Sequence, residues 1–199
     1  MEKDKMSTQL MEHVNDYVMI QNLIPTDLCR SLIRESSSPK KKWSKHSWSQ
    51  YGHDSYSMPE KELDVLPSTR DQYKSVSQYI KIALENYQKK YTREKAKTNP
   101  GWFNHIFYGK FNKMKVGTLM RTHHDHIHTL FDDKLKGVPL ISIIGLLNDN
   151  YEGGGFMCRD KEIKLRRGDI LLFPSNFMYP HGVKKVTKGM RFSFVSWAF

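Results

Sequence analysis

The 199-residue sequence has few cysteines, no long apolar run and no apolar leader, and each absence narrows its class. A membrane-spanning helix needs about 20 consecutive apolar residues, and no run approaches that length, so a helical membrane protein is not expected. The N-terminal stretch MEKDKMSTQLMEHVNDY mixes charges of both signs and lacks the apolar centre of a secretory signal. Cys29 and Cys158 lie in dissimilar sequence contexts, which favours two free thiols in a reducing compartment over a disulfide.

Acidic residues are scarce relative to basic ones: 21 Asp and Glu stand against 32 Lys and Arg, giving a net charge of +11. The basic residues fall in short blocks along the chain, among them PKKKWSK, QKKYTREKAK and VKKVTK. Such a surface attracts acidic partners, including nucleic acid, through long-range electrostatics. Scattered blocks serve solubility equally well, so charge alone leaves both interpretations open.

Length and composition predict one folded domain, because 199 residues with 38% hydrophobic side chains suffice for a single core. We expect a flexible N-terminal lead over residues 1–15 and a single domain over 16–199, in which residues 25–98 form a helical support. TDLCRSLIRES is predicted as one helix, and a second follows Ser68 or Thr69, its candidate N-caps. Apolar residues recur along the second helix at three- and four-residue spacings: Val76, Ile80, Ala83, Leu84, Tyr87 and Tyr91.

Residues 102–199 are predicted to form the β-core. Short β-branched or aromatic runs, such as LISIIGLLN, GDILLFPS and RFSFVSWAF, alternate with turn signals such as LKGVP and TKG. Regular short strands with this punctuation are typical of an antiparallel sandwich or barrel. The predicted fold class is therefore α+β, mainly β, with the N-terminal helices packed on one sheet of the β-core.

The stretch RTHHDHIHT, residues 121–129, gathers four histidines around one aspartate. If it is extended, residues two apart share a face, so His123 and Asp125 point one way. The other histidines then point the opposite way. We expect His124, His126 and His128 to be solvated or hydrogen-bonded polar residues, with a second metal site on that face as the alternative.

A His-x-Asp pair needs a third ligand from elsewhere to form a metal site, and His181 in FMYPHGV is the distant candidate in the β-core. His105 is nearer but precedes the pair on an adjacent stretch. Two histidines and one carboxylate with open positions form the facial triad of non-haem Fe(II) oxygenases. Such a triad leaves coordination positions for a bidentate co-substrate and dioxygen.

Arg191 follows His181 by ten residues, in GMRFSFVSW. Strand alternation puts Arg191 and Ser193 on one face, with Phe192 and Phe194 on the other. An arginine that points into a barrel interior is costly unless a carboxylate meets it. A guanidinium fork with a neighbouring hydroxyl therefore suits a dicarboxylate anion.

This order, H-x-D, a distant H, and R-x-S ten residues later, resembles the 2-oxoglutarate- and Fe(II)-dependent dioxygenases. The stretches DYVMIQNLIPTDLCRSLI, LLNDNYEGGGF and RRGDILLFPSNFMYPHGVKKVTKGMRFSFVSWAF resemble the prolyl 4-hydroxylase-like branch of bacterial or phage origin. The resemblance covers about residues 16–199 and is firmest over 117–199. It implies a double-stranded β-helix, the jelly-roll or cupin-like core.

The resemblance also implies a role for each motif residue. His123, Asp125 and His181 match the iron ligands, and Arg191, assisted by Ser193, matches the residue that holds the distal carboxylate of 2-oxoglutarate. Many relatives add a tyrosine to this carboxylate, either before the His-x-Asp pair or on the strand that here reads IIGLLND, without a tyrosine. Tyr108 is the substitute that we name, and an ordinary core tyrosine is the alternative.

The activity implied by the resemblance is hydroxylation of a C–H bond with Fe(II), 2-oxoglutarate and O2, releasing succinate and CO2, while ascorbate keeps the iron reduced. A prolyl residue of a protein or peptide is the expected substrate, in the cytoplasm of a bacterium or a virus-infected host cell. A free amino acid or other small molecule is the first alternative. Oxidative demethylation of nucleic acid is less favoured, because RFSFVSWAF lacks the second arginine that is usual in that branch. An inactive β-helix binding module would be expected to have a defective triad.

Overall fold

A computed structural model describes residues 17–50, 53–56, 63–92, 103, 105–107, 109–125 and 139–199. The predicted N-terminal lead and Tyr108 lie outside these residues. Cys29 and Cys158 are both buried free thiols, as expected. Within the described ranges, no helix combines the length and the apolar character needed to cross a bilayer.

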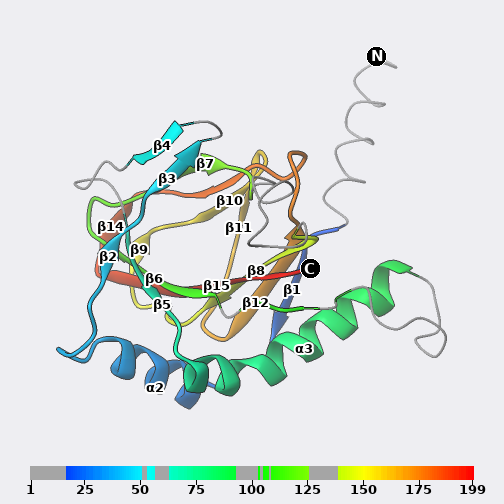
Figure 1. Cartoon of the computed structure of the whole chain (residues 1–199), viewed down its shortest axis with the longest axis horizontal. Helices are drawn as coiled ribbons and strands as arrows, with labels where there is room; N and C mark the ends of the chain where they lie inside the picture. The colour runs from blue at the N-terminus through cyan, green and yellow to red at the C-terminus, as the bar shows by residue number, and fades with distance from the viewer. Residues whose placement is uncertain are drawn as a thin grey trace.

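Two antiparallel sheets face each other and form the β-core (Figure 1). The larger sheet contains, in spatial order, β1 (Met19–Asn22), β12 (Asp169–Pro174), β8 (Ile141–Leu146), β15 (Met190–Ala198), β6 (Lys110–Lys115), β5 (Asp64–Pro67) and β2 (Ser44–Lys45). The smaller contains β11 (Lys161–Ile163), β10 (Phe156–Cys158), β13 (His181–Val183) and β7 (Met120–His123). Two short pairs complete the strands: β9 (Glu152–Gly153) with β14 (Val186–Lys188), and β3 (Trp48–Gln50) with β4 (His53–Tyr56).

The chain passes back and forth between the two sheets from β6 onward. It enters the large sheet at β6, the small one at β7, the large one at β8, and the small one again at β10 and β11. It then enters the large sheet at β12, the small one at β13 and the large one at β15. This alternation is a double-stranded β-helix, so the predicted fold class is confirmed.

Among the described residues, two helices precede the β-core, at the positions that the sequence predicts. Helix α2 spans Thr26–Ser36 and helix α3 spans Arg70–Thr92. Thr69 is the N-cap of α3: its hydroxyl accepts a hydrogen bond from the Gln72 backbone N–H at 3.3 Å, and its own N–H donates to Gln72 Oε1 at 3.1 Å. This reciprocal pair is a capping box, which satisfies two backbone donors that the first helical turn leaves without partners.

Both helices cover the outer face of the large sheet, opposite the small sheet (Figure 1). One apolar cluster joins the helices to the sheet. It includes Leu32 of α2 and Ile80 of α3, together with the outward-facing sheet residues Ile143, Leu172 and Phe194. A second apolar cluster fills the space between the sheets, with Met114, Ile144, Phe156, Phe173 and Val195 among its members. The first cluster fixes the large sheet, so the residues on its inner face are held firmly against the small sheet.

Gly145 and Phe194 set the close approach of β8 and β15. The two residues are directly opposite in the antiparallel register. A Cβ added to Gly145 would lie 2.0 Å from Cε1 of the Phe194 ring, so the glycine leaves the space that the ring fills. The same register places Ser142 opposite Trp197 on the inner face, where both residues contact the site described below.

Substituting Gly145→Ala is expected to lower the free energy of unfolding by about 1–3 kcal/mol, because the Phe194 ring must leave its position. Urea unfolding followed by circular dichroism measures this loss. The cost of Gly145→Ala should be smaller in a Phe194→Leu background, where the clashing ring atoms are gone. Equal costs in the two backgrounds would contradict this account of the pair.

Candidate active site

Three side chains from two distant parts of the chain converge at one end of the space between the sheets. His123 ends β7, Asp125 lies two residues beyond it, and His181 begins β13. Their ligand atoms lie within 4.8 Å of one another. The strand register explains the meeting, because His123 and His181 are paired across β7 and β13.

The two imidazoles are oriented so that Nε2 of each faces the carboxylate. Nδ1 of His123 lies 2.9 Å from the backbone oxygen of Arg121, and Nδ1 of His181 lies 3.0 Å from that of Tyr179. A carbonyl oxygen can only accept, so each Nδ1 bears the proton and each Nε2 keeps its lone pair. Both Nε2 atoms lie 3.7 Å from an Asp125 oxygen, beyond hydrogen-bond length.

Electrostatics keep these groups in the forms that bind a metal ion. Burial, helped by His181 and opposed by Asp125, lowers the pKa of His123 to about 4. Burial by itself would raise the pKa of Asp125, but His181 and the hydrogen bond from Ser142 lower it overall. A neutral imidazole and an ionised carboxylate are the forms that coordinate a divalent cation. The residues present therefore fit a divalent metal ion such as iron.

Asp125 and His181 are held in place by neighbouring side chains. The Trp197 indole N–H donates to Asp125 Oδ2 at 2.9 Å, and the Ser142 hydroxyl donates to the same oxygen. The His181 ring packs edge-on against Phe173 at 4.7 Å between centroids and stacks with Phe156 at 5.8 Å. Supporting contacts of this kind orient the ligands of metal sites and tune their affinity.

A buried guanidinium lies farther along the same inner face. Arg191, on β15, is 2% exposed, and its Nη1 donates to Ser193 Oγ at 2.9 Å. Its Nε has no hydrogen-bond partner among the described residues. Burial lowers the pKa of Arg191, while the adjacent, hydrogen-bonded Tyr151 opposes that shift. A buried cation whose partners are all neutral is suited to bind an anion, so the residues present fit one carboxylate of a dicarboxylate.

Tyr151 is a site residue that sequence reasoning missed. It lies in the segment after β8, and Gly154 passes so close that an added Cβ would lie 3.0 Å from the Tyr151 ring and 3.2 Å from Arg191 Cδ. Strand β8 itself contains no tyrosine. The glycines of YEGGG, which begin two residues after the tyrosine, were the sequence feature that could have indicated this contact.

Lys110 is a second residue that sequence reasoning missed. It faces inward from β6, and its Nζ lies 5.8 Å from the centre of the Trp197 ring. It forms no ion pair with any described residue, and burial lowers its pKa, although the charge of Asp125 opposes the shift. Its signal was weak, because one lysine in KFNKMK gives no indication of its face.

The remaining histidines of the cluster add nothing to the metal centre in the part of the chain that is described. His124 is exposed, one residue beyond the end of β7. His126 and His128 lie outside the described residues, so their predicted role stays a prediction.

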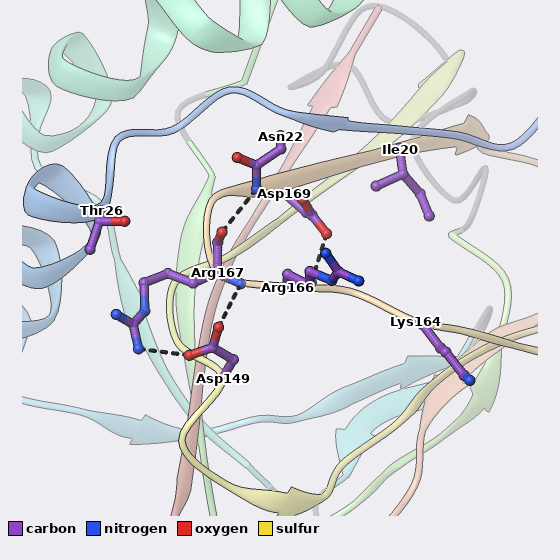
Figure 2. A pocket seen from close by; sticks show the side chains of 8 residues that line it. All are labelled: Ile20, Asn22, Thr26, Asp149, Lys164, Arg166, Arg167 and Asp169. Carbon is purple, nitrogen blue, oxygen red and sulfur yellow. Dashed lines mark hydrogen bonds and ion pairs between the residues drawn. The ribbon is translucent and has the colours of Figure 1, made fainter.

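An outer hollow of about 780 Å³ lies between β1 and the turn that precedes β12 (Figure 2). Several of its polar groups pair with one another: Arg167 pairs with Asp149 at 2.6 Å, and Asp169 accepts from Asn22 Nδ2 at 2.7 Å and from the Arg166 backbone N–H at 2.6 Å. These bonds fix the turn into β12. The hollow is therefore structural and separate from the buried Arg191 pocket.

The sequence of the β-core matches a known family. Residues 109–199 match the family described as the 2OG-Fe(II) oxygenase superfamily, and this segment includes His123, Asp125, His181 and Arg191. The resemblance to this superfamily is confirmed. A PKHD-type hydroxylase of Aliarcobacter butzleri (strain RM4018) is 32% identical over 127 residues, which cover 57% of this chain and 55% of the relative. The match thus spans about half the length of that curated relative.

Solved oxygenase structures share the fold. A Pseudomonas putida prolyl-4-hydroxylase has a TM-score of 0.62 at 16% identity, covering 91% of both chains. A Trichoplax adhaerens prolyl hydroxylase in complex with a hypoxia inducible factor oxygen degradation domain peptide fragment has a TM-score of 0.66 at 14% identity, covering 100% of this chain and 90% of the other. A viral collagen prolyl hydroxylase from Paramecium Bursaria Chlorella virus-1 has a TM-score of 0.55 at 14% identity, covering 92% and 94%. Identities this low establish the oxygenase fold alone.

Replacing Asp125→Ala is expected to weaken binding of Mn(II), a redox-stable stand-in for ferrous iron, by on the order of a hundredfold or more. The substitution removes the carboxylate that faces both imidazoles. Isothermal titration calorimetry measures the affinity, with His124→Ala as the control because His124 is the exposed neighbour. Equal Mn(II) affinities in the two variants would contradict the metal site.

Trp197→Phe is expected to weaken Mn(II) binding by on the order of tenfold, because the ring remains while the hydrogen bond to Asp125 is lost. Trp43→Phe is the matched control: Trp43 Nε1 donates to Ser36 O at 3.0 Å, on the helix side of the large sheet. The control should keep the wild-type affinity. Equal losses in the two variants would mean that indole loss acts through general stability.

Proposed function

We propose that this protein is an Fe(II)- and 2-oxoglutarate-dependent dioxygenase that hydroxylates a prolyl residue of a protein or peptide. The observation that carries the proposal is the convergence of His123, Asp125 and His181 beside the buried guanidinium of Arg191. Residues that could hold a divalent metal, together with a buried guanidinium, match the needs of a dicarboxylate co-substrate that also chelates the metal. The match of residues 109–199 to the 2OG-Fe(II) oxygenase superfamily supports the same reaction class.

Each site residue has a defined task in this proposal. His123, Asp125 and His181 hold the ferrous ion, and Arg191 with Ser193 holds the distal carboxylate of 2-oxoglutarate. When bound, iron and 2-oxoglutarate supply the activation of O2 and the oxidation of the substrate C–H bond, with succinate and CO2 as co-products.

The protein surroundings restrict that chemistry to one place. Trp197 and Ser142 both donate to Asp125 Oδ2, which would leave Oδ1 of the carboxylate for the metal. Phe156 and Phe173 keep the His181 ring in position. Both rings are buried, Phe156 on the small sheet and Phe173 on the large one, so they would keep water away from the His181 ring. A dry, shaped cavity is what the protein adds to the reactivity of the metal.

The peptide substrate is supported by the relatives. The similar structures include a prolyl hydroxylase in complex with a peptide fragment, and the curated relative is described as a PKHD-type hydroxylase. The triad and arginine are all present, which favours an enzyme over an inactive binding module. Ascorbate as the reductant, like the cytoplasmic location, is part of the proposal.

Succinate formation tests the reaction, and the stimulating substrate tests its class. The Fe(II)-loaded protein is incubated with 2-oxoglutarate and O2, alone or with proline-rich peptides, free amino acids, or methylated oligonucleotides. Peptide-dependent succinate, with a mass gain of one oxygen atom on the peptide, is the expected result. Stimulation by free amino acids alone would move the assignment to small-molecule hydroxylation, and stimulation by oligonucleotides alone would move it to demethylation.

Arg191→Met is expected to raise the KM for 2-oxoglutarate by on the order of a hundredfold, because two charge-assisted hydrogen bonds to its carboxylate are lost. The KM for the peptide should stay unchanged, since the peptide makes no contact with this pocket. Arg167→Met serves as the matched control, because Arg167 lies in the outer hollow and pairs with Asp149 (Figure 2). An unchanged KM for 2-oxoglutarate in Arg191→Met would remove the arginine from the co-substrate site.

A further inference from the structure

Asn112 is a buried amide in the interior of the β-core with no role so far. It lies on β6, directly opposite Ser193 on β15 and Val65 on β5. Residues paired across antiparallel strands share a face, with Cβ atoms about 5 Å apart. Asn112 therefore faces the same space as Ser193, whose hydroxyl accepts from Arg191.

The Asn112 side chain has no bonding partner in the part of the chain that is described, although it is only 7% exposed. Its Oδ1 is fully enclosed and unbonded, as is Nε of Arg191. The neighbour on the β5 side, Val65, is apolar and offers nothing to an amide. The register thus places two unbonded polar groups on the same inner face of the large sheet, each next to Ser193.

An unsatisfied buried amide costs about 1–3 kcal/mol, and replacing it with an apolar residue would remove that cost. The fold gains nothing from this asparagine as it stands. A polar residue kept at a cost to stability is typical of a binding site, where a ligand supplies the missing partner. The charge of Arg191 indicates that this partner is an anion.

We propose that Asn112 is a binding residue for the distal carboxylate of 2-oxoglutarate, to which its amide N–H donates beside the guanidinium of Arg191. The amide can present either its nitrogen or its oxygen to the pocket, because the two orientations have the same shape. This inference rests on the proposed function and deepens it by assigning a further contact to the co-substrate.

The test is 2-oxoglutarate binding to the Mn(II)-loaded full chain, measured by calorimetry, together with the melting temperature of the ligand-free protein. Asn112→Ala should raise the Kd for 2-oxoglutarate by on the order of tenfold to a hundredfold. Its melting temperature should stay equal to wild type or rise, because the truncation removes an unsatisfied group. Asn112→Asp, of equal size, should bind more weakly still, since it meets the carboxylate with a like charge.

Gln21→Ala is the matched control, because that amide is satisfied within the protein. Gln21 Nε2 donates to Ala83 O at 2.9 Å, and its Oε1 accepts from Asn86 Nδ2 at 2.8 Å. The control should show the opposite pattern, with a lower melting temperature and an unchanged Kd for 2-oxoglutarate. An Asn112→Ala protein that behaves like the control would show a structural role and overturn the inference.

A second ligand identifies which end of the co-substrate Asn112 contacts. 2-Oxobutyrate keeps the carboxylate and oxo groups that chelate a metal but has no distal carboxylate. Asn112→Ala should weaken the binding of 2-oxoglutarate without weakening the binding of 2-oxobutyrate. Equal weakening of the binding of both ligands would overturn the inference. A wild-type protein that binds Mn(II) but not 2-oxoglutarate would instead refute the proposed function, and this inference with it.

Discussion

The burial of the Arg191 guanidinium is the constraint on which the site depends. A buried charge with neutral partners costs several kcal/mol, and among the described residues its polar partners are Ser193 and Tyr151. The two apolar clusters on either side of the large sheet offset that cost, because they hold β15 in place through its apolar residues. The energetic strain of the pocket is therefore separated from the contacts that fold the domain.

This separation follows from the period of a β-strand. Along β15, Phe192 and Phe194 pack outward against the helical layer, while Arg191 and Ser193 point inward. A one-residue slip would exchange the two sets, burying the charge beneath the helices. The contact of Gly145 with Phe194 opposes such a slip, because in the observed register the ring fills the space that the missing Cβ of Gly145 leaves.

Much of the fold and the metal centre could be predicted from the sequence, for identifiable reasons. The helix over 26–36 was predicted to the residue, and the triad was found because its residue types and spacing are rare. Prediction failed where contacts depend on the register between distant strands. Neither Asn112 nor Lys110 has a sequence context that reveals its face, and Tyr151 contacts Arg191 only because Gly153 and Gly154 turn the chain, at φ angles of 71° and 62°.

The same reasoning explains why the pocket would select a dicarboxylate. A ligand that only chelates the metal leaves Arg191 Nε and the Asn112 amide unbonded, so the original cost persists in the complex. A ligand with a second carboxylate at the right distance removes that cost, and the relief adds to its binding free energy. Discrimination between these two ligands then rests on polar groups that the protein itself does not satisfy. Buried polar sites reject analogues that lack one functional group in the same way. The polar residues that weaken the ligand-free fold are thus the ones that would give the site its selectivity.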